Sequence, residues 1–405
     1  MEKRMKFDMA YNFDLELLEE LKKIGNVHSV FAKINRDIIG GGRPSAALPN
    51  IEQEELKHHV RKAHEAGIKF NYLLNSVCMD NNELKKDFFF AVNNYLKQLI
   101  DLGVDSVTVA NPFLCDMIKR NYPNLEICLS VNTRVHTIQQ IHYWEQFGVN
   151  EITLDQIVNR NFDELEKILK YTKKTGTRIR LFANNICLHD CPLRTYHGLS
   201  NSHASQDSCG LKEHLHYYYY KCSKMKMEHL EKLISATWIR PDDLHYYREV
   251  MQKADNYNLV FKLAERSSTS AYLIKILRAY NEEHYEGNLM DIIYAVQGKN
   301  LLPIEQTQVS QYYKPEIMNK IKSLYNLDWL YIDNRALDGF LEGFREHYNC
   351  DHKICSDGKS RERNTCTYCK AWADKCIKYD KEKKMQYEHN LDDILEAIQK
   401  GDVFN

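Results

Sequence analysis

Short runs of β-branched and aromatic residues alternate with longer amphipathic stretches along the first two thirds of the chain. The runs that predict strands are Val27–Ile34, Ile68–Asn75, Ser106–Ala110, Glu126–Val131, Glu151–Asp155, Arg178–Asn184, Ser235–Arg240 and Leu259–Ala264. Between them, apolar positions at helical spacing predict helices at Ile51–Ala66, Glu83–Leu102, Ile138–Phe147, Phe162–Thr175 and Pro241–Ala254. Eight strands separated by helices favour an α/β fold, a closed TIM-like (β/α)8 barrel, over the competing doubly wound open sheet.

Glycine follows several of the predicted helices directly, at Gly67, Gly103, Gly148 and Gly176, which is the expected signal for a helix C-terminus. One long segment interrupts the alternation. Residues 186–234 are polar and rich in Cys, His and Tyr, and they follow the sixth predicted strand. Loops in this position lie on the face of a barrel that carries the chemistry, so we expect this insertion to belong to the functional site.

The pattern changes beyond the barrel. We expect the barrel to occupy residues 1–285, with the insertion 186–234 inside it. Strand signals are sparse over residues 286–345, which predict a mainly helical appendage, and residues 346–405 form a cysteine-rich C-terminal segment.

Composition narrows the class of protein. The 405 residues include 55 Lys plus Arg and 56 Asp plus Glu, so no overall field attracts nucleic acid or an anionic membrane. No signal peptide and no apolar stretch approaching the ~20 residues of a membrane span are visible, which predicts a cytoplasmic protein with no membrane partner. In a reducing compartment the 12 cysteines are expected to be thiols or metal ligands, and not disulfides.

Four cysteines lie in the insertion, in the spacing C-x3-C-x17-C-x12-C: Cys187, Cys191, Cys209 and Cys222. Thiolates from one loop at the end of a strand can surround an iron–sulfur cluster or another soft metal. Zinc is the competing metal, although the group contains no CxxC knuckle, which is typical of structural zinc sites. Inert core thiols are the third reading, which the polar surroundings of the loop disfavour.

A second group follows near the C-terminus and consists of Cys350, Cys355, Cys366, Cys369 and Cys376. The CxxC knuckle within it predicts a second metal site, for zinc or for a second iron–sulfur cluster. Five cysteines leave one to spare, and His347 and His352 are alternative ligands.

Polar residues follow the predicted strands, where a barrel has its mouth. The candidates for substrate binding are Arg43, Asn75, Asn132, Arg134, Arg240 and Arg266. Four arginines in one cavity would bind an anionic substrate or co-substrate, and the glycines at 40–42 would let backbone amides approach it. Alternatively, these arginines pair with Asp155, Glu265 or helix ends. By position, Asp155 and Glu265 are also the candidates for catalytic proton transfer.

Several segments together resemble the peptidase U32 family. They include Gly41-Gly42-Arg43, Leu129-Ser130-Val131-Asn132-Thr133, Ile239-Arg240-Pro241-Asp242, Leu263-Ala264-Glu265-Arg266 and the four-cysteine insertion. The better understood members are barrel proteins with a [4Fe-4S] cluster on four cysteines. They hydroxylate a tRNA or rRNA base or a ubiquinone precursor without dioxygen, in some cases drawing on prephenate. The resemblance implies that Cys187, Cys191, Cys209 and Cys222 bind such a cluster, whereas the cysteine-rich tail suggests a divergent branch with its own substrate.

We therefore expect an iron–sulfur enzyme that hydroxylates, or modifies by related redox or group-transfer chemistry, a small molecule, a nucleotide of tRNA or rRNA, or a peptide side chain. A partner protein or electron donor would reduce the cluster. A metal-dependent peptidase is one alternative, although the chain has neither His-Glu-x-x-His nor Gly-x-Ser-x-Gly. The other is an RNA-binding or partner-binding protein with structural metal sites, in which the basic residues of the tail grip the RNA.

Overall fold

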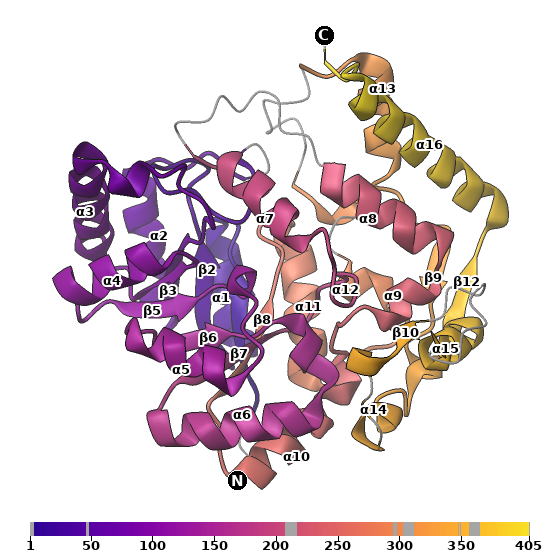
Figure 1. The fold of residues 1–405 in the computed structure, drawn as a ribbon, viewed down its shortest axis with the longest axis horizontal. Coiled ribbons are helices and arrows are strands. Elements are labelled where there is room, and N and C mark those ends of the chain that lie inside the picture. Colours follow the sequence, from indigo (N-terminus) through magenta and orange to yellow (C-terminus); the bar gives the residue numbers. More distant parts are fainter. Residues whose placement is uncertain are drawn as a thin grey trace.

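The computed structural model describes residues 4–45, 48–206, 217–294, 298–302, 312–346, 348, 350–355 and 365–404. Eight parallel strands pair in chain order and close into a barrel, and helices surround it (Figure 1). The strands are β1 (Lys6–Ala10), β2 (Val27–Ala32), β3 (Lys69–Leu74), β4 (Ser106–Val109), β5 (Glu126–Leu129), β6 (Glu151–Thr153), β7 (Arg178–Phe182) and β8 (Leu259–Leu263). The predicted TIM-like barrel is therefore confirmed.

The barrel helices are α1 (Leu15–Ile24), α2 (Gln53–Glu65), α3 (Lys86–Asp101), α4 (Pro112–Asn121), α5 (Ile138–Gln146), α6 (Phe162–Thr175), α10 (Leu244–Ala254) and α11 (Ser270–Glu282). Helix α6 shows why the sequence forms them. Its apolar residues Leu165, Ile168 and Leu169 share one buried face, as their spacing predicts. Gly176 ends the helix with a φ of 82° and donates its N–H to the carbonyl of Thr172, at 2.8 Å. Such a left-handed cap favours glycine, so the predicted signal is confirmed here.

Two strands differ from the prediction. Strand β1, which closes the barrel between β2 and β8, lies in a segment where the sequence analysis predicts none, because it is only five residues long and begins in a charged terminus. The predicted strand Ser235–Arg240 is wrong, since no strand of the structure includes these residues. Trp238 is buried there against Phe340, with 5.7 Å between the ring centroids. The apolar run therefore reflects packing against the C-terminal region and not strand pairing.

The insertion after β7 forms α7 (Arg194–His203), α8 (Tyr217–Glu228) and α9 (Glu231–Ser235). The C-terminal region contains α12 (Met290–Ile293), α13 (Pro315–Ser323), β9 (Leu330–Ile332), α14 (Glu342–Glu346), β10 (Ile354–Cys355), β11 (Thr365–Cys366), α15 (Tyr368–Cys376), β12 (Ile377–Tyr379) and α16 (Lys381–Lys400). Strand β9 pairs antiparallel with β12, so residues 286–345 are not purely helical.

The insertion connects the barrel to the C-terminal region. Helix α16 packs against α8 and α13, and α15 packs against α9 (Figure 1). One continuous apolar core extends from the barrel strands to Leu391 and Ile394 of α16. None of the described helices is long and apolar enough to cross a lipid bilayer. The cysteine-rich tail therefore packs on the same insertion that carries the first cysteine group.

Candidate functional site

An arginine–glutamate pair joins the loop after β2 to the end of β8. Arg43 donates from Nε to Oε1 of Glu265 at 2.9 Å, and its Nη2 contacts Oε2. The hydroxyl of Ser267 donates to the same Oε1 at 3.2 Å. Both oxygens of Glu265 thus accept hydrogen bonds from Arg43. Of the two alternatives that the sequence leaves open for Arg43, the structure shows pairing with a carboxylate. In this geometry the carboxylate orients the guanidinium of Arg43.

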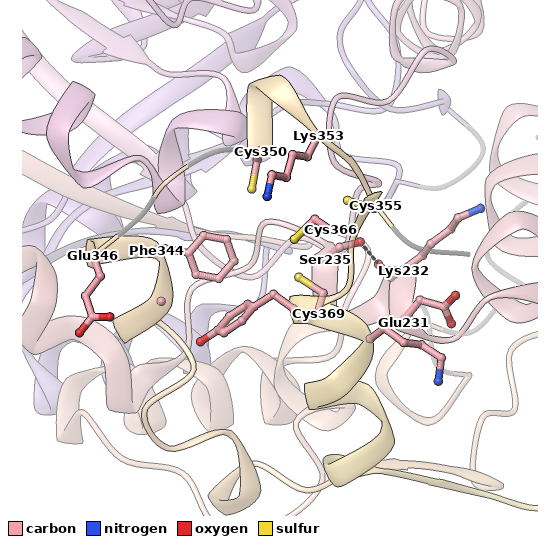
Figure 2. Close-up of a pocket in the computed structure, with 13 residues that line it drawn as sticks. Glu231, Lys232, Ser235, Phe344, Glu346, Cys350, Lys353, Cys355, Cys366 and Cys369 are labelled. Carbon is pink, nitrogen blue, oxygen red and sulfur yellow. Dashed lines mark hydrogen bonds between the residues drawn. The ribbon is translucent and has the colours of Figure 1, made fainter. Parts of the chain in front are cut away.

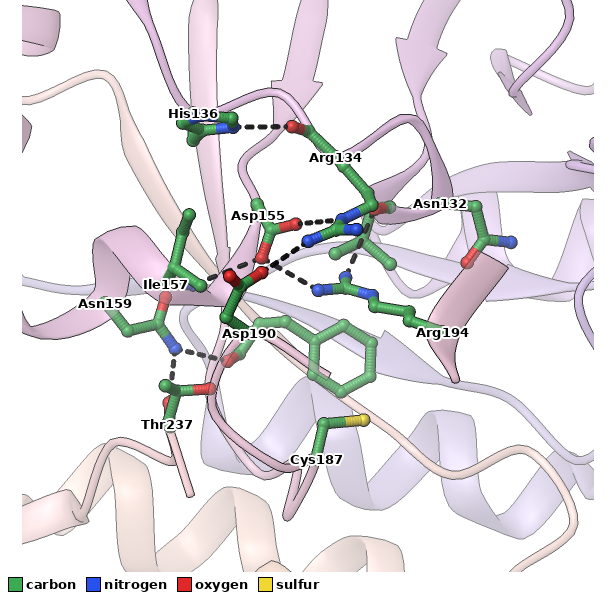
Figure 3. Close-up of polar contacts among 12 residues, drawn as sticks. Asn132, Arg134, His136, Asp155, Ile157, Asn159, Cys187, Asp190, Arg194 and Thr237 are labelled. Carbon is green, nitrogen blue, oxygen red and sulfur yellow. Dashed lines mark hydrogen bonds and ion pairs between the residues drawn. The ribbon is translucent and has the colours of Figure 1, made fainter. Parts of the chain in front are cut away.

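A second network links the loops after β5, β6 and β7 (Figure 3). Asp155 is fully buried and accepts from Arg134 Nε at 3.2 Å and from Arg194 Nη1 at 2.8 Å. Arg134 also donates from Nη2 to Asp190 at 2.7 Å. Burial lowers the pKa of Arg134, but the two carboxylates outweigh it and hold that pKa above its usual value. Asp155 therefore fixes two guanidinium groups beside the cysteine-bearing loop.

The other two candidate arginines differ from each other. Arg266 is 4% exposed, and its Nη1 has no hydrogen-bond partner among the described residues. Burial lowers the pKa of Arg266 to about 10, although the neighbouring Glu265 opposes the shift. Arg240 lies apart, because it donates to both oxygens of Asp243, at 2.8 and 2.6 Å, and to the carbonyl of Asn334 at 2.6 Å. The four arginines therefore do not converge, and Arg266 keeps donor capacity for an anion.

The glycine run at residues 40–42 is enclosed by polar side chains. Its three amides donate in turn to Asp37, Ser205 and Asn75, at 2.7, 2.7 and 3.0 Å. A Cβ on the last glycine would lie 2.9 Å from Nδ2 of Asn75 and 3.4 Å from Nδ2 of Asn132. The glycines are needed for this close packing. All three amides donate to side chains of the protein itself.

The first cysteine group surrounds the start of the insertion. Cys187 follows β7, and its amide donates to Oδ1 of Asn185 at 2.9 Å. Burial raises the pKa of Cys191 and of Cys222, and the charge of Cys187 raises both further, so these three thiols share one neighbourhood. Cys209 lies outside the described residues. Within the part of the chain that the structure describes, no three His, Cys, Asp or Glu side chains converge closely enough to hold a single metal ion.

A buried lysine accompanies these thiols. Lys226 of α8 is 3% exposed, and its Nζ donates to the carbonyl of Ile186 at 3.3 Å. Burial lowers the pKa of Lys226, but the charge of Cys222 and its hydrogen bond outweigh this and raise it. A buried ammonium group stabilises negative charge on neighbouring sulfurs. Three soft donors and this cation fit an anionic iron–sulfur cluster held by thiolates.

The second cysteine group lines a cavity of about 310 Å³, which we call the C-terminal cysteine cavity. Four of its sulfurs gather there, as Figure 2 shows: those of Cys350, Cys355, Cys366 and Cys369. Cys376 is fully buried at the other end of α15, and its carbonyl accepts from the amide of Asp333 at 2.9 Å. Cys376 does not line the cavity. His347 lies outside the described residues.

Comparison with known proteins gives the family. The model of peptidase family U32 matches residues 42–313. The chain belongs to peptidase family U32. It is 28% identical over 383 residues to an uncharacterized protease of Methanocaldococcus jannaschii, which covers 92% of this chain and 99% of that protein. The matched range includes the mouth residues and the first cysteine group, whereas the four cysteines of the C-terminal cysteine cavity lie outside it.

Two further relatives of this U32 protein are named tRNA hydroxylation protein P. The one from Haemophilus influenzae is 27% identical over 168 residues, 40% of this chain and 34% of that protein. The one from Escherichia coli is 25% identical over 161 residues, 38% of this chain and 33% of that protein. A solved U32 peptidase, Mk0906, aligns with a TM-score of 0.47 and 20% identity over 65% of this chain and 93% of its own.

Sequence reasoning missed several charged groups in the barrel and beside the two cysteine groups. Arg194, Lys226 and Arg160 have no motif of their own, and each meets its partners only through the fold. Lys262 of β8 is a fourth. Burial and, to a smaller extent, the charge of Arg180 lower its pKa to about 7, and its Nζ lies 3.9 Å from the ring centroid of Phe31. Only their positions in the chain could have indicated these residues. Arg194 and Lys226 lie in the insertion, and Lys262 lies near the end of a barrel strand.

Proposed function

We propose that this U32 protein is an iron–sulfur enzyme that hydroxylates, or otherwise modifies without dioxygen, a nucleotide of tRNA. The observation that carries the proposal is the grouping of Cys187, Cys191 and Cys222 around buried Lys226, beside the arginine network of the barrel mouth. The proteins named for tRNA hydroxylation support the choice of substrate, although each matches this chain over only about a third of its own length.

The cluster would bind to Cys187, Cys191, Cys222 and, as the fourth ligand, Cys209. When bound, a [4Fe-4S] cluster supplies one-electron redox chemistry and an iron that can accept a substrate oxygen. Lys226 would balance the charge of the thiolates from the buried side. The donor set and the burial of Lys226 support these roles, because negative charge on partly buried thiolates is stabilised by a nearby cation.

The chain's own residues would position the substrate. Arg266 has an unpartnered Nη1 and would bind an anionic group such as a phosphate, or the carboxylate of an anionic co-substrate. Asp155 would keep Arg134 and Arg194 oriented beside the first cysteines, and Glu265 would do the same for Arg43. We assign Asp155 and Glu265 to positioning, since arginines engage both oxygens of each carboxylate.

The test combines metal analysis with nucleoside analysis. Protein purified without oxygen should contain iron and acid-labile sulfide. A strain that lacks the protein should regain a hydroxylated tRNA nucleoside, detected by mass spectrometry, when it makes the wild type but not C187S/C191S. The matched control is C115S, because Cys115 is a buried thiol of α4 away from both cysteine groups. An iron-free protein that restores the full modification would refute the proposal.

Peptidase activity is the second candidate, favoured by the family's description and by the name of the archaeal relative. Against it stands the lack of a His-Glu-x-x-His or Gly-x-Ser-x-Gly motif in the chain. Peptide cleavage by the purified protein that a chelator abolishes, together with unmodified tRNA, would replace the first proposal by this one. Salt-sensitive tRNA binding without modification would favour the RNA-binding alternative.

A further inference from the structure

We propose that Cys350, Cys355, Cys366 and Cys369 bind a second iron–sulfur cluster of the [4Fe-4S] type, with Arg160 as its buried counter-cation. Its four cysteines are different from those of the first group and lie outside the range that matches the family, whereas Arg160 lies inside it. The inference does not depend on tRNA as the substrate.

Local structure brings the four thiols together. Strands β10 and β11 pair so that Cys355 lies opposite Cys366, across a segment of chain that separates them in sequence. Cys369 lies in the first turn of α15, three residues after Cys366, and Cys350 begins the short 3-10 turn before β10. All four line the C-terminal cysteine cavity (Figure 2).

Arg160 is the independent observation that points to a ligand. It ends the 3-10 turn Gln156–Arg160 and is 2% exposed. Its Nη1 and Nη2 donate to the carbonyls of Ile234 and Trp238, at 2.9 and 3.3 Å. Its Nε is buried and has no hydrogen-bond partner in the described chain, where no carboxylate forms an ion pair with it either. A buried guanidinium needs a nearby negative charge to offset its desolvation.

Aromatic rings hold this guanidinium in place. Its Cζ lies 4.5 Å from the ring centroid of Trp238, 4.9 Å from Phe340 and 5.4 Å from Phe344. Cation–π contacts are worth about 0.5–2 kcal/mol each, which does not replace a full counter-charge. Arg160 lines a small pocket together with Cys350, Cys355 and Cys369. A metal centre held by four thiolates carries net negative charge and would supply what this arginine lacks.

The arrangement of the sulfurs favours a cluster over zinc. A structural zinc ion needs four sulfurs at about 2.3 Å from one point. Here the four thiols border a cavity of about 310 Å³, and no three potential ligands of the described chain converge on a single-ion site. A four-iron cluster binds each thiolate through a different iron and therefore holds its sulfurs farther apart.

The two cysteine groups meet at one loop. His189, between Cys187 and Cys191, lines the same small pocket as Cys350 and Cys369. Loss of one cluster can therefore disturb the other, so the test must count the iron of each site separately.

The experiment measures iron, zinc and acid-labile sulfide per chain in the full-length protein, reconstituted without oxygen. The wild type should hold about eight irons, and C366S/C369S about four. C376S is the matched control and should keep about eight, because Cys376 lies outside the cavity. One zinc and about four irons in the wild type, or unchanged iron in C366S/C369S, would overturn the proposal.

Two further variants keep the result interpretable. C187S/C191S should keep about four irons with the paramagnetic resonance of the second cluster, even where tRNA modification is lost, so this inference and the proposed function can fail separately. C355A changes an exposed side chain and should not prevent folding. It should lower total iron by about one to four atoms, and unchanged iron and spectrum in C355A would contradict the ligand set.

Discussion

The barrel mouth and the C-terminal cysteine cavity hold their arginines in opposite ways. At the mouth, carboxylates neutralise Arg43 and Arg134, through Glu265 and Asp155. Beside the cavity, Arg160 is fixed by aromatic rings and carbonyl groups, and no carboxylate of the described residues pairs with it.

This difference teaches how to interpret a buried cation. A paired arginine is neutralised within the protein, so its presence says little about a ligand. An arginine buried without a carboxylate has lost the hydration that stabilises its charge, and a structure that keeps it needs negative charge from elsewhere. By this criterion the cavity indicates an anionic ligand more strongly than the mouth does, although the mouth has more arginines.

The largest expected effect is that of R160M, which keeps much of the volume and removes the charge. We expect the cluster-bound protein to lose about 3–5 kcal/mol of unfolding free energy, because an anionic centre is left without its cation. The cluster-free protein should change much less, since the lost hydrogen bonds are offset by removal of an uncompensated charge. Urea unfolding without oxygen, before and after cluster removal, measures both. R160K is the control that keeps the charge, and equal destabilisation of both forms by R160M would contradict the comparison.

At the mouth the matching change is D155N, which deprives Arg134 and Arg194 of their shared carboxylate. We expect a loss of about 2–3 kcal/mol, less than for a fully buried pair, because Arg134 is 36% exposed and keeps Asp190. In contrast to R160M, D155N should lower the unfolding free energy by the same amount in the cluster-bound and the cluster-free protein. Tm and tRNA modification are the two readouts.

The control for D155N is D243N, which breaks the buried pair with Arg240 away from the mouth. D243N should lower Tm at least as much but leave the activity of the folded fraction unchanged. If both variants lose activity in proportion to stability, Asp155 has no positioning role.

Sequence periodicity predicted most of the barrel because burial on one face is a local property of each element. Runs of apolar residues predict seven of the eight strands. Strand β1 is missed because it is only five residues long. The apolar run around Trp238 is wrongly predicted as a strand, because its residues are buried against the C-terminal region and not in a sheet. The pairing of charged side chains across the fold is not a local property. Arg43 and Glu265 are 222 positions apart, so no spacing could reveal that they pair.

The second cysteine group is also beyond prediction from spacing alone, because the sequence contains five cysteines there and does not show which four line the cavity. Cys376 follows Cys369 by seven residues in α15, which places it about 10 Å farther along the helix axis. Cys376 can be excluded from the cavity only when the boundaries of α15 are known. The role of Arg160 requires the whole tertiary structure, because the aromatic rings and the cysteines around it come from four separate segments of the chain.

R266Q tests the mouth residue that most resembles Arg160, since it too is buried with an unpartnered nitrogen. We expect about a ten- to hundredfold rise in KM for tRNA with a smaller change in kcat, because a charge-assisted hydrogen bond contributes about 1.5–3 kcal/mol. R61Q, on the exposed side of α2, is the surface control and should change KM little. An unchanged KM in R266Q would mean that the mouth has no anion site at this arginine.

The smallest expected effect concerns Lys262, whose side chain lies over Phe31 as Arg160 lies over Trp238. An arginine keeps its charge in such a place, but a lysine can release its proton. Burial lowers the pKa of Lys262 from 10.5 to about 7, so between pH 7 and 9 the unfolded chain binds more protons than the folded one. The unfolding free energy should then rise with pH over this window, by at most about 1.4 kcal/mol per pH unit.

K262M should remove that slope, as urea unfolding at pH 7, 8 and 9 would measure. The window ends near pH 9 because burial raises the pKa of Cys115 and of Cys128 to about 12, and such thiols make stability fall as the unfolded chain ionises first. Equal slopes in both proteins would show that Lys262 stays charged when folded. It would then need an anion as Arg160 does, and the barrel interior beside Phe31 would become a second place to look for one.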